Sequence, residues 1–394
     1  MSETTNAKPP FLRRVRIRNF KSIAYCDVTL EPLTILVGRN GTGKSNFIEA
    51  LAFLRDCVDT NLERAIRDHG GWDRIHRKDA GEEPMEIGLE FYTGEDILAY
   101  KLNLSSLFRS QKIDKEEHAS LIQYIDFPLN STHGDILIKN LVLKSHSPRM
   151  GADLDVFNRT SAAIFHAELQ TRRLYNFNLY PTLLKLPKEF EIETPLKSDG
   201  SNIASVLRSL KATAPETFDR IAAYLRTITG NIDLVGTTSV GQYEIIDFKV
   251  DRGDKPLEFD ASGMSDGTLR AVFQTIPPHG PPSLVAIEEP ETGLHPSAMQ
   301  TLLSAFDEAT LRTQVLITTH SPQMLEAEEV RPENIRVVQM IDGQTWIGPI
   351  DRPAREIIKK RFNTLSELEA VDRLSIDEED LARQQRESKQ EASV

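Results

Sequence analysis

The segment that decides the fold is residues 33–48, which read LTILVGRNGTGKSNFI. Its short apolar start is typical of a buried strand. The octapeptide GRNGTGKS follows and matches the pattern G-x-x-x-x-G-K-[ST] in full. Apolar residues then recur at helical spacing, at Phe47, Ile48, Leu51, Leu54 and Val58. This order of strand, glycine-rich loop and amphipathic helix predicts a phosphate-binding loop.

The chemistry of this loop suits a nucleoside triphosphate. Glycines let the backbone curl so that several N–H groups point at one anion, and the following helix adds its positive N-terminal end. Lys44 can reach the β- and γ-phosphates, and the Ser45 hydroxyl can ligate Mg²⁺. A glycine-rich turn that binds nothing is the alternative, and the strand–loop–helix context argues against it. The predicted nucleotide-binding residues here are Gly38, Arg39, Asn40, Gly41, Thr42, Gly43, Lys44 and Ser45.

A second segment, LVAIEEPETGLHP at 284–296, ends an apolar strand on two glutamates. Burying like charges is unfavourable unless a metal or ligand compensates them. A phosphate-binding loop needs a carboxylate for Mg²⁺ and a base for the attacking water. We assign Glu288 to the metal and Glu289 to the water, because successive strand residues point in different directions. Solvated loop charges are the alternative.

Two weaker signals follow the same logic. Ser265, Asp266 and Gly267 open a predicted helix and could bind an anion through its N-terminal end. On spacing alone, a plain helix cap is the better explanation, since Ser and Asp are common caps. His320 ends the apolar segment VLITT and could contact a γ-phosphate or orient water. For a lone histidine, a structural role is the better explanation.

The composition is that of an ordinary globular protein. The chain has 394 residues, 39% hydrophobic and 27% charged, with a net charge of −12. This charge argues against a globally basic nucleic-acid binder. Only Cys26 and Cys57 are available, so no disulfide framework or cysteine zinc site is expected. We find no signal peptide and no membrane-length apolar stretch, and we expect a cytoplasmic protein without a membrane partner.

The motifs together resemble the ABC-type ATPase heads of the SMC and RecF group. More narrowly, the segments NFKSI, VGRNGTGKSNFIEAL, DGSNIASVL, SDGT, EEPETGLHP and TTHSP are similar to those of AAA-type ATPases related to the OLD (overcoming lysogenisation defect) proteins. These are bacterial proteins often tied to phage defence. The resemblance covers roughly residues 12–350. Its motifs are specific for ATP binding and less so for a biological role.

The resemblance implies ATP and Mg²⁺ as cofactors and a head-to-head homodimer or higher oligomer. Each ATP would contact the phosphate loop of one chain and Ser265, Asp266 and Gly267 of the other, which turns the weak helix-start signal into a binding site. His320 would be the family's switch histidine. The implied catalytic residues are Glu289, His320 and Lys44, and Ser45 and Glu288 would hold the metal.

The implied fold is α/β: an ABC-type P-loop ATPase head with a central mixed sheet flanked by helices, an inserted helical and loop region, and a charged C-terminal tail. The expected divisions are a disordered N-terminus at 1–10, half-heads at 11–100 and 236–350, an insertion at 101–235, and a C-terminal helix and tail at 351–394. Unlike SMC proteins, the chain shows no sustained heptads, so a compact insertion replaces the coiled coil. We also find no Toprim nuclease signature after His320.

Two functions from different classes remain. The first is a Mg²⁺-dependent ATPase that regulates a separately encoded effector, such as a nuclease, in anti-phage defence. The second is a RecF-like, ATP-dependent DNA clamp; a transporter ATPase ranks last. The clamp rests on the basic residues Arg13, Arg14, Arg16, Arg18 and Lys21, which could contact DNA phosphates. A solvated strand face is the favoured alternative for these residues.

Overall fold

The computed structural model describes two compact units. Unit 1 comprises Met1–Leu174, Glu333–Arg355 and Leu374–Val394, and unit 2 comprises Tyr175–Pro332 and Glu356–Arg373. The predicted disordered N-terminus at 1–10 lies outside the described residues, as does much of the predicted insertion at 101–235. The described residues are 11–92, 97–104, 122–126, 137–138, 174–177, 181–191, 196–197, 199–250, 255–275, 283–327, 329–359 and 374–391.

Unit 1 is built on a mixed sheet with the strand order β7-β6-β5-β4-β1-β2-β16-β15-β3. Pairing is parallel between β15 and β3 and between β16 and β2, and antiparallel between β1 and each of its neighbours. The strands are β1 Phe11–Phe20, β2 Ile23–Thr29, β3 Leu33–Val37, β4 Met85–Tyr92, β5 Ile97–Leu104, β6 Ile122–Asp126, β7 Leu137–Ile138, β15 Ile335–Ile341 and β16 Gln344–Pro349. The helices are α1 Lys44–Asp59, α2 Leu62–Asp68, α3 Trp72–Ile75, α10 Arg352–Lys359 and α12 Glu378–Glu391.

The core of unit 1 explains the strand–loop–helix order of the sequence. All five residues of β3 are buried, as expected of a strand inside the sheet. The α1 residues Phe47, Ile48, Leu51 and Leu54 are buried, whereas Val58 is half-buried. The loop between β3 and α1 is therefore held at both ends by buried apolar side chains.

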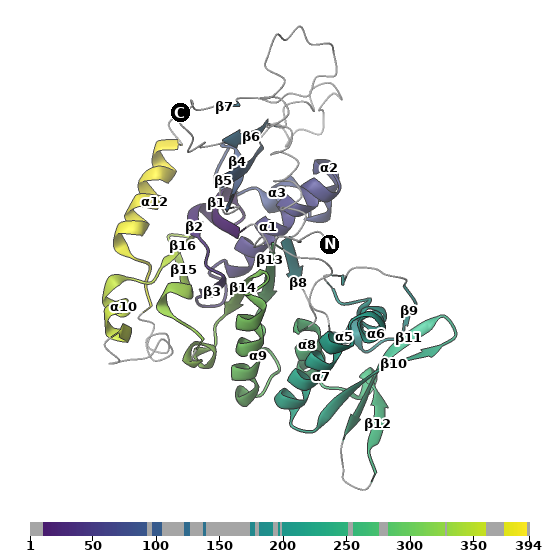
Figure 1. Ribbon diagram of the computed structural model, residues 1–394. Coiled ribbons are helices and arrows are strands. Elements are labelled where there is room, and N and C mark those ends of the chain that lie inside the picture. The colour runs from purple at the N-terminus through teal and green to yellow at the C-terminus, as the bar shows by residue number, and fades with distance from the viewer. Residues whose placement is uncertain are drawn as a thin grey trace, which may run out of the picture. The chain divides into compact units, whose positions relative to one another are not determined.

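The charge-rich end of the chain contributes a helix to unit 1. Figure 1 shows α12, in yellow, beside β2 and β16, which it contacts. Gln384 is fully buried and donates to the Ile347 carbonyl at 2.9 Å. The Tyr25 hydroxyl donates to Glu387 at 2.8 Å. Because these polar groups are satisfied where they are buried, α12 is anchored to the sheet.

Unit 2 combines a parallel strand pair with a helical lobe and a second sheet. Its elements are β8 Leu174–Phe177, α5 Pro181–Leu184, β9 Lys188–Glu189, α6 Ile203–Thr213, α7 Pro215–Thr229, β10 Ile232–Val240, β11 Tyr243–Val250, β12 Leu257–Asp260, η3 Ala261–Gly263, α8 Asp266–Gln274, β13 Leu284–Glu288, α9 Pro296–Ala309, β14 Gln314–Thr319, η4 Pro322–Glu326 and η5 Pro332–Asn334. Strands β13 and β14 pair in parallel, with Glu288 opposite Thr318. The order β10-β11-β12 forms the second sheet, and β9 also pairs with β11.

Helix α7 organises the lobe of unit 2. It contacts α6, α8, α9 and β10, as the teal and green helices of Figure 1 illustrate. Its buried residues Phe218, Ile221 and Leu225 follow the predicted helical spacing. Pro215 begins the helix and Gly230 follows its last residue, both as the sequence indicates. With strands and helices in both units and parallel and antiparallel pairs in the sheet, the predicted α/β class is confirmed.

Candidate functional site

The predicted site residues fall into two sets. Unit 1 carries the phosphate-loop residues 38–45, and unit 2 carries residues 265–267, Glu288, Glu289 and His320. Each set is defined by its own local contacts. Within each unit the structure brings several of these residues together, and it also shows partners that the sequence did not indicate.

The phosphate loop accepts only glycine at two of its positions. A Cβ on Gly43 would lie 2.2 Å from the Thr345 hydroxyl, and the residue has a positive φ of 104°. A Cβ on Gly38 would lie 2.3 Å from the Val338 carbonyl oxygen. Gly41 is different, because its φ is positive but no atom lies within 4 Å of its Cβ position. The loop is therefore packed against β15 and β16 at its ends and open in its middle.

Lys44 lies inside this loop. Its ammonium donates to the carbonyl oxygens of Gly38 and Arg39, at 2.5 Å and 3.0 Å. The residue is buried, whereas Arg39, Asn40 and Ser45 are exposed. A buried ammonium that is held by loop carbonyls is already placed beside any anion that the loop N–H groups bind.

Residues outside the motif support the loop from one side. The Thr345 hydroxyl of β16 donates to the Thr42 carbonyl at 2.7 Å and contacts the Ser22 hydroxyl at 2.7 Å. Asn46 donates to Ser22 at 2.6 Å. No role for Ser22 or Thr345 was predicted from the sequence, since their role depends on how β1, β2 and β16 pair. These contacts hold the loop against β16.

In unit 2, Glu288 and Glu289 have different backbone conformations. Glu288 is the last residue of β13, and Glu289 follows in the left-handed region with a φ of 42°. This conformation is unfavourable for a residue with a side chain and needs support from its surroundings. The support comes from β14: the Glu289 N–H donates to the Thr318 carbonyl at 3.1 Å and to its hydroxyl at 3.2 Å.

The strained turn brings two predicted catalytic residues together. Glu289 Oε1 lies 3.3 Å from His320 Nδ1. The two side chains are 39% and 44% exposed, so both remain accessible to solvent. A carboxylate beside an imidazole is a common arrangement for moving or orienting a proton.

A third acid of the same segment, Glu291, was not singled out from the sequence and proves to be buried. Glu291 is only 6% exposed, and its Oε1 accepts a hydrogen bond from the Thr319 hydroxyl at 2.5 Å. Its Oε2 is buried and has no hydrogen-bond partner among the described residues. Burial raises the pKa of Glu291. The available signal was the third carboxylate of EEPE, but its burial depends on the packing of β14.

The helix-start motif has the capping geometry that its spacing indicates. Ser265 caps α8, and its hydroxyl accepts from the Thr268 N–H at 3.2 Å. Asp266 forms an ion pair with Lys185 at 2.7 Å. Gly267 meets the EEPETG turn: a Cβ there would lie 1.9 Å from the Gly293 carbonyl oxygen. The motif is thus a helix cap packed on the segment that follows the glutamates, and nucleotide contact by these residues remains a prediction.

No ready-made metal cage is found in the described parts of either unit. No group of three or more His, Cys, Asp or Glu residues converges there. Magnesium commonly uses one or two protein carboxylates and completes its shell with phosphate oxygens and waters. A serine hydroxyl and a carboxylate are donors of the kind magnesium uses, and the assignment of Ser45 and Glu288 to the metal remains a prediction.

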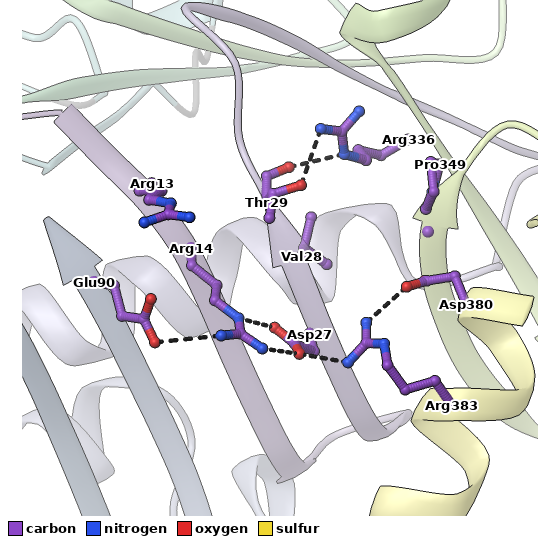
Figure 2. A pocket seen from close by; sticks show the side chains of 11 residues that line it. Arg13, Arg14, Asp27, Val28, Thr29, Glu90, Arg336, Pro349, Asp380 and Arg383 are labelled. Carbon is purple, nitrogen blue, oxygen red and sulfur yellow. Dashed lines mark hydrogen bonds and ion pairs between the residues drawn. The ribbon is translucent and has the colours of Figure 1, made fainter. Parts of the chain in front are cut away.

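The basic strand is largely neutralised within unit 1. Arg14 and Arg16 lie near carboxylates of the neighbouring strands, whereas Arg13 is exposed. In Figure 2, Asp27 lies between Arg14 and Arg383 in a cavity of about 240 Å³. The acidic partners are Asp27 for Arg14, Glu90 for Arg16, Glu83 for Arg18 and Glu49 for Lys21. These ion pairs, two of them across strands, favour a structural role over DNA contact.

The fold and the phosphate loop define the class of the chain as an α/β, ABC-type P-loop ATPase head. Residues 33–326 match the family described as "AAA domain, putative AbiEii toxin, Type IV TA system", and the chain belongs to this family. The SMC head solved with the C-winged helix domain of ScpA is similar, with a TM-score of 0.51 at 14% identity over 88% of this chain and 99% of that chain. At this identity the likeness shows the fold alone.

Among curated relatives, two DNA replication and repair proteins RecF match short stretches. The RecF of Arthrobacter sp. (strain FB24) is 47% identical over 45 residues, which is 11% of each chain. The RecF of Streptococcus agalactiae is 27% identical over 116 residues, 29% of each chain. The chain matches the RecF relatives over only 11% to 31% of their own length. In the described part of this chain, no helix is both long enough and apolar enough to cross a membrane.

Proposed function

We propose that the chain is a Mg²⁺-dependent ATPase that hydrolyses ATP between two heads of a homodimer. The observation that carries this proposal is the contact of Glu289 with His320 on a strained turn, in a chain with a complete phosphate loop. Strained backbone persists where surrounding structure maintains it, and it gathers at active sites. The AAA family to which the chain belongs supports ATP as the nucleotide.

The residues divide the chemistry between them. The phosphate loop would bind the phosphates through N–H groups and Lys44, and Ser45 and Glu288 would hold Mg²⁺. Magnesium, when bound, neutralises the charge that develops on the phosphates. Glu289 takes the proton of the attacking water, and His320 contacts the γ-phosphate. Ser265, Asp266 and Gly267 of the second head complete the nucleotide contacts.

The Glu289→Gln variant tests this assignment. An amide at that position still accepts hydrogen bonds but cannot take a proton from water. ATP binding should persist, hydrolysis should fall by about 100-fold or more, and ATP should trap a dimer that size exclusion detects. Wild-type protein without Mg²⁺-dependent hydrolysis, or normal turnover by this variant, would contradict the proposal.

We further propose that head closure controls a separately encoded effector, such as a nuclease, in cytoplasmic anti-phage defence. The family description names a toxin of a toxin–antitoxin system, which supports a partner protein. Both cysteines are free, which suits a reducing compartment. Co-purification with the product of the neighbouring gene, with and without ATP, tests the idea. Absence of binding in both conditions would exclude the regulatory function.

A RecF-like DNA clamp is the second candidate, and the RecF matches favour it. The ion pairs of Arg14 and Arg16 argue against the clamp, because their acidic partners offset the positive charge that would attract DNA phosphates. DNA binding measured across a salt series separates the two functions. Affinity that requires ATP and falls steeply with salt supports the clamp. Absence of DNA binding at low salt would exclude the clamp and favour the effector-regulating ATPase.

A further inference from the structure

A buried acid holds the turn that carries His320. Thr292 and Gly293, which follow Glu291, are exposed, and Pro290, which precedes it, is buried; the glutamate itself is only 6% exposed. Acidic residues are seldom buried unless they are paired. The burial of this carboxyl side chain therefore needs an explanation within unit 2.

The partner of Glu291 is Thr319, which is fully buried at the end of β14. The Thr319 hydroxyl donates to Glu291 Oε1 at 2.5 Å and accepts from the Ser321 N–H at 3.0 Å. A hydroxyl has one proton to donate and lone pairs to accept with, so both contacts form at once. The turn from 319 to 321 is thereby tied to Glu291, and His320 is its middle residue.

His320 itself is loosely packed. Its side chain is 44% exposed, and so is 39% of Glu289, which it meets at 3.3 Å. Exposed side chains retain many rotamers, so contact between them depends on where the backbone places them. On the His320 side, Thr319 provides that placement through the hydrogen bond it donates to Glu291 and the one it accepts from the Ser321 N–H.

We propose that Glu291 is a positioning residue for hydrolysis, which holds the Thr319–Ser321 turn so that His320 stays against Glu289. This inference rests on the proposed roles of Glu289 and His320. Glu291 touches neither ATP nor water in this scheme and acts through the Thr319 hydroxyl. The buried Oε2 without a partner is consistent with this role, because a hydrophobic residue would fill that space without the desolvation that a carboxyl suffers.

Substitutions at both ends of the hydrogen bond test the proposal. Glu291→Gln and Thr319→Ser keep the acceptor and the donor, whereas Glu291→Ala and Thr319→Val remove them. The disrupting pair should lower kcat by about 10- to 100-fold with little change in KM for ATP, and the conservative pair should stay near wild type. Glu329→Ala is the matched control, since Glu329 accepts from the Ser304 hydroxyl at 2.5 Å elsewhere in unit 2.

A background variant separates positioning from general stability. If Glu291 acts through the histidine, Glu291→Ala should lower kcat no further in a His320→Ala protein. If Glu291→Ala lowered kcat in the His320→Ala protein by as much as it does in wild type, the proposal would be overturned. So would wild-type kcat in Thr319→Val, which nearly preserves side-chain shape and so guards against the chance that Glu291→Ala fails to fold.

A second readout does not depend on hydrolysis. The His320 ring signal can be observed by NMR in full-length protein labelled on its histidines and assigned with His320→Ala. It should shift or broaden in Glu291→Ala and Thr319→Val, but not in Glu291→Gln or in the Glu329→Ala control. An unshifted signal in both disrupting variants would refute the positioning role. Wild type without ATPase activity would instead refute the proposed function, while the ring signal still reports on the turn.

Discussion

Replacing Gly267 with alanine should destabilise unit 2, although alanine is the better helix former. The new Cβ would lie 1.9 Å from the Gly293 carbonyl oxygen and 2.5 Å from its carbon. Ordinary contact begins at 3.4 Å, so the two backbones must separate by about 1.5 Å. Overpacking of this kind lowers the free energy of unfolding by about 1–3 kcal/mol. The helix gains less than 1 kcal/mol in return, which leaves a net loss of about 1–2 kcal/mol.

Gly263→Ala is the matched control, four residues upstream. Its Cβ would lie 3.5 Å from the Phe259 ring, an ordinary contact. This change should leave stability unaltered or raise it by about 0.4–1 kcal/mol, because it restricts the unfolded chain. The two substitutions are chemically identical, but only Gly267→Ala should lower the free energy of unfolding.

Urea denaturation followed by circular dichroism measures both variants. Tryptophan fluorescence is unsuitable, since Trp72 and Trp346, the two tryptophans of the chain, both lie in unit 1. Hydrogen exchange of α8 amides localises the effect, which should be faster exchange in Gly267→Ala. Equal unfolding midpoints for the two alanine variants would refute the close approach of Gly267 and Gly293.

Three further predictions concern the loop, the glutamates and a histidine of unit 1. Lys44→Ala should remove ATP binding measured by calorimetry, since the loop loses its cation; unchanged affinity would contradict the loop assignment. Glu288→Asp should slow hydrolysis only mildly and Glu289→Asp by about 100-fold, because a base needs hydrogen-bond reach and a water-bridged metal ligand does not; equal losses would withdraw these roles. Burial disfavours the charged form of His69. Hydrogen bonds with Asp56 and Glu49 outweigh this effect and raise the pKa of His69 to about 9. The folded pKa exceeds the usual 6.5, so the stabilisation is complete below about pH 6.5 and lost as pH rises through about 9. The difference in free energy of unfolding between wild type and His69→Gln, measured by urea denaturation, should fall from about 2 kcal/mol at pH 6 to near zero at pH 10. A difference that stays constant with pH would refute the raised pKa of His69.

The phosphate loop was predictable because its requirements are local. Gly43 needs a positive φ, and its neighbours in sequence already specify a strand before it and a helix after it. The sequence also placed Glu288 and Glu289 at the end of a strand, where the structure has them, while their separate roles remain a prediction. What the sequence did not indicate is the left-handed turn at Glu289, which depends on Thr318 of another strand.

The roles of the charged residues were harder to predict, since they depend on partners distant in sequence. Arg14 reads as a free basic residue until β2 places Asp27 beside it. Glu291 reads as a loop charge until β14 buries it against Thr319. Helix α12 reads as solvated because its apolar residues are few, yet buried Gln384 binds the backbone of β16. Pairing of strands and burial of single polar groups are tertiary properties, and a period of 2 or 3.6 does not encode them.

The contact of Gly267 with Gly293 also changes how variants of the helix-start motif must be interpreted. Gly293 belongs to the same turn as Glu291, which holds the residues on either side of His320. A substitution at Gly267 that disturbs this turn would therefore slow hydrolysis even where no nucleotide contact is lost. Ser265→Ala offers a cleaner test of nucleotide contact, because it removes a cap worth about 1 kcal/mol without touching the glycine pair. Loss of ATP-dependent dimerisation in Ser265→Ala with an unchanged His320 ring signal would show that the serine binds nucleotide across the dimer; loss of both would show that it acts through the turn.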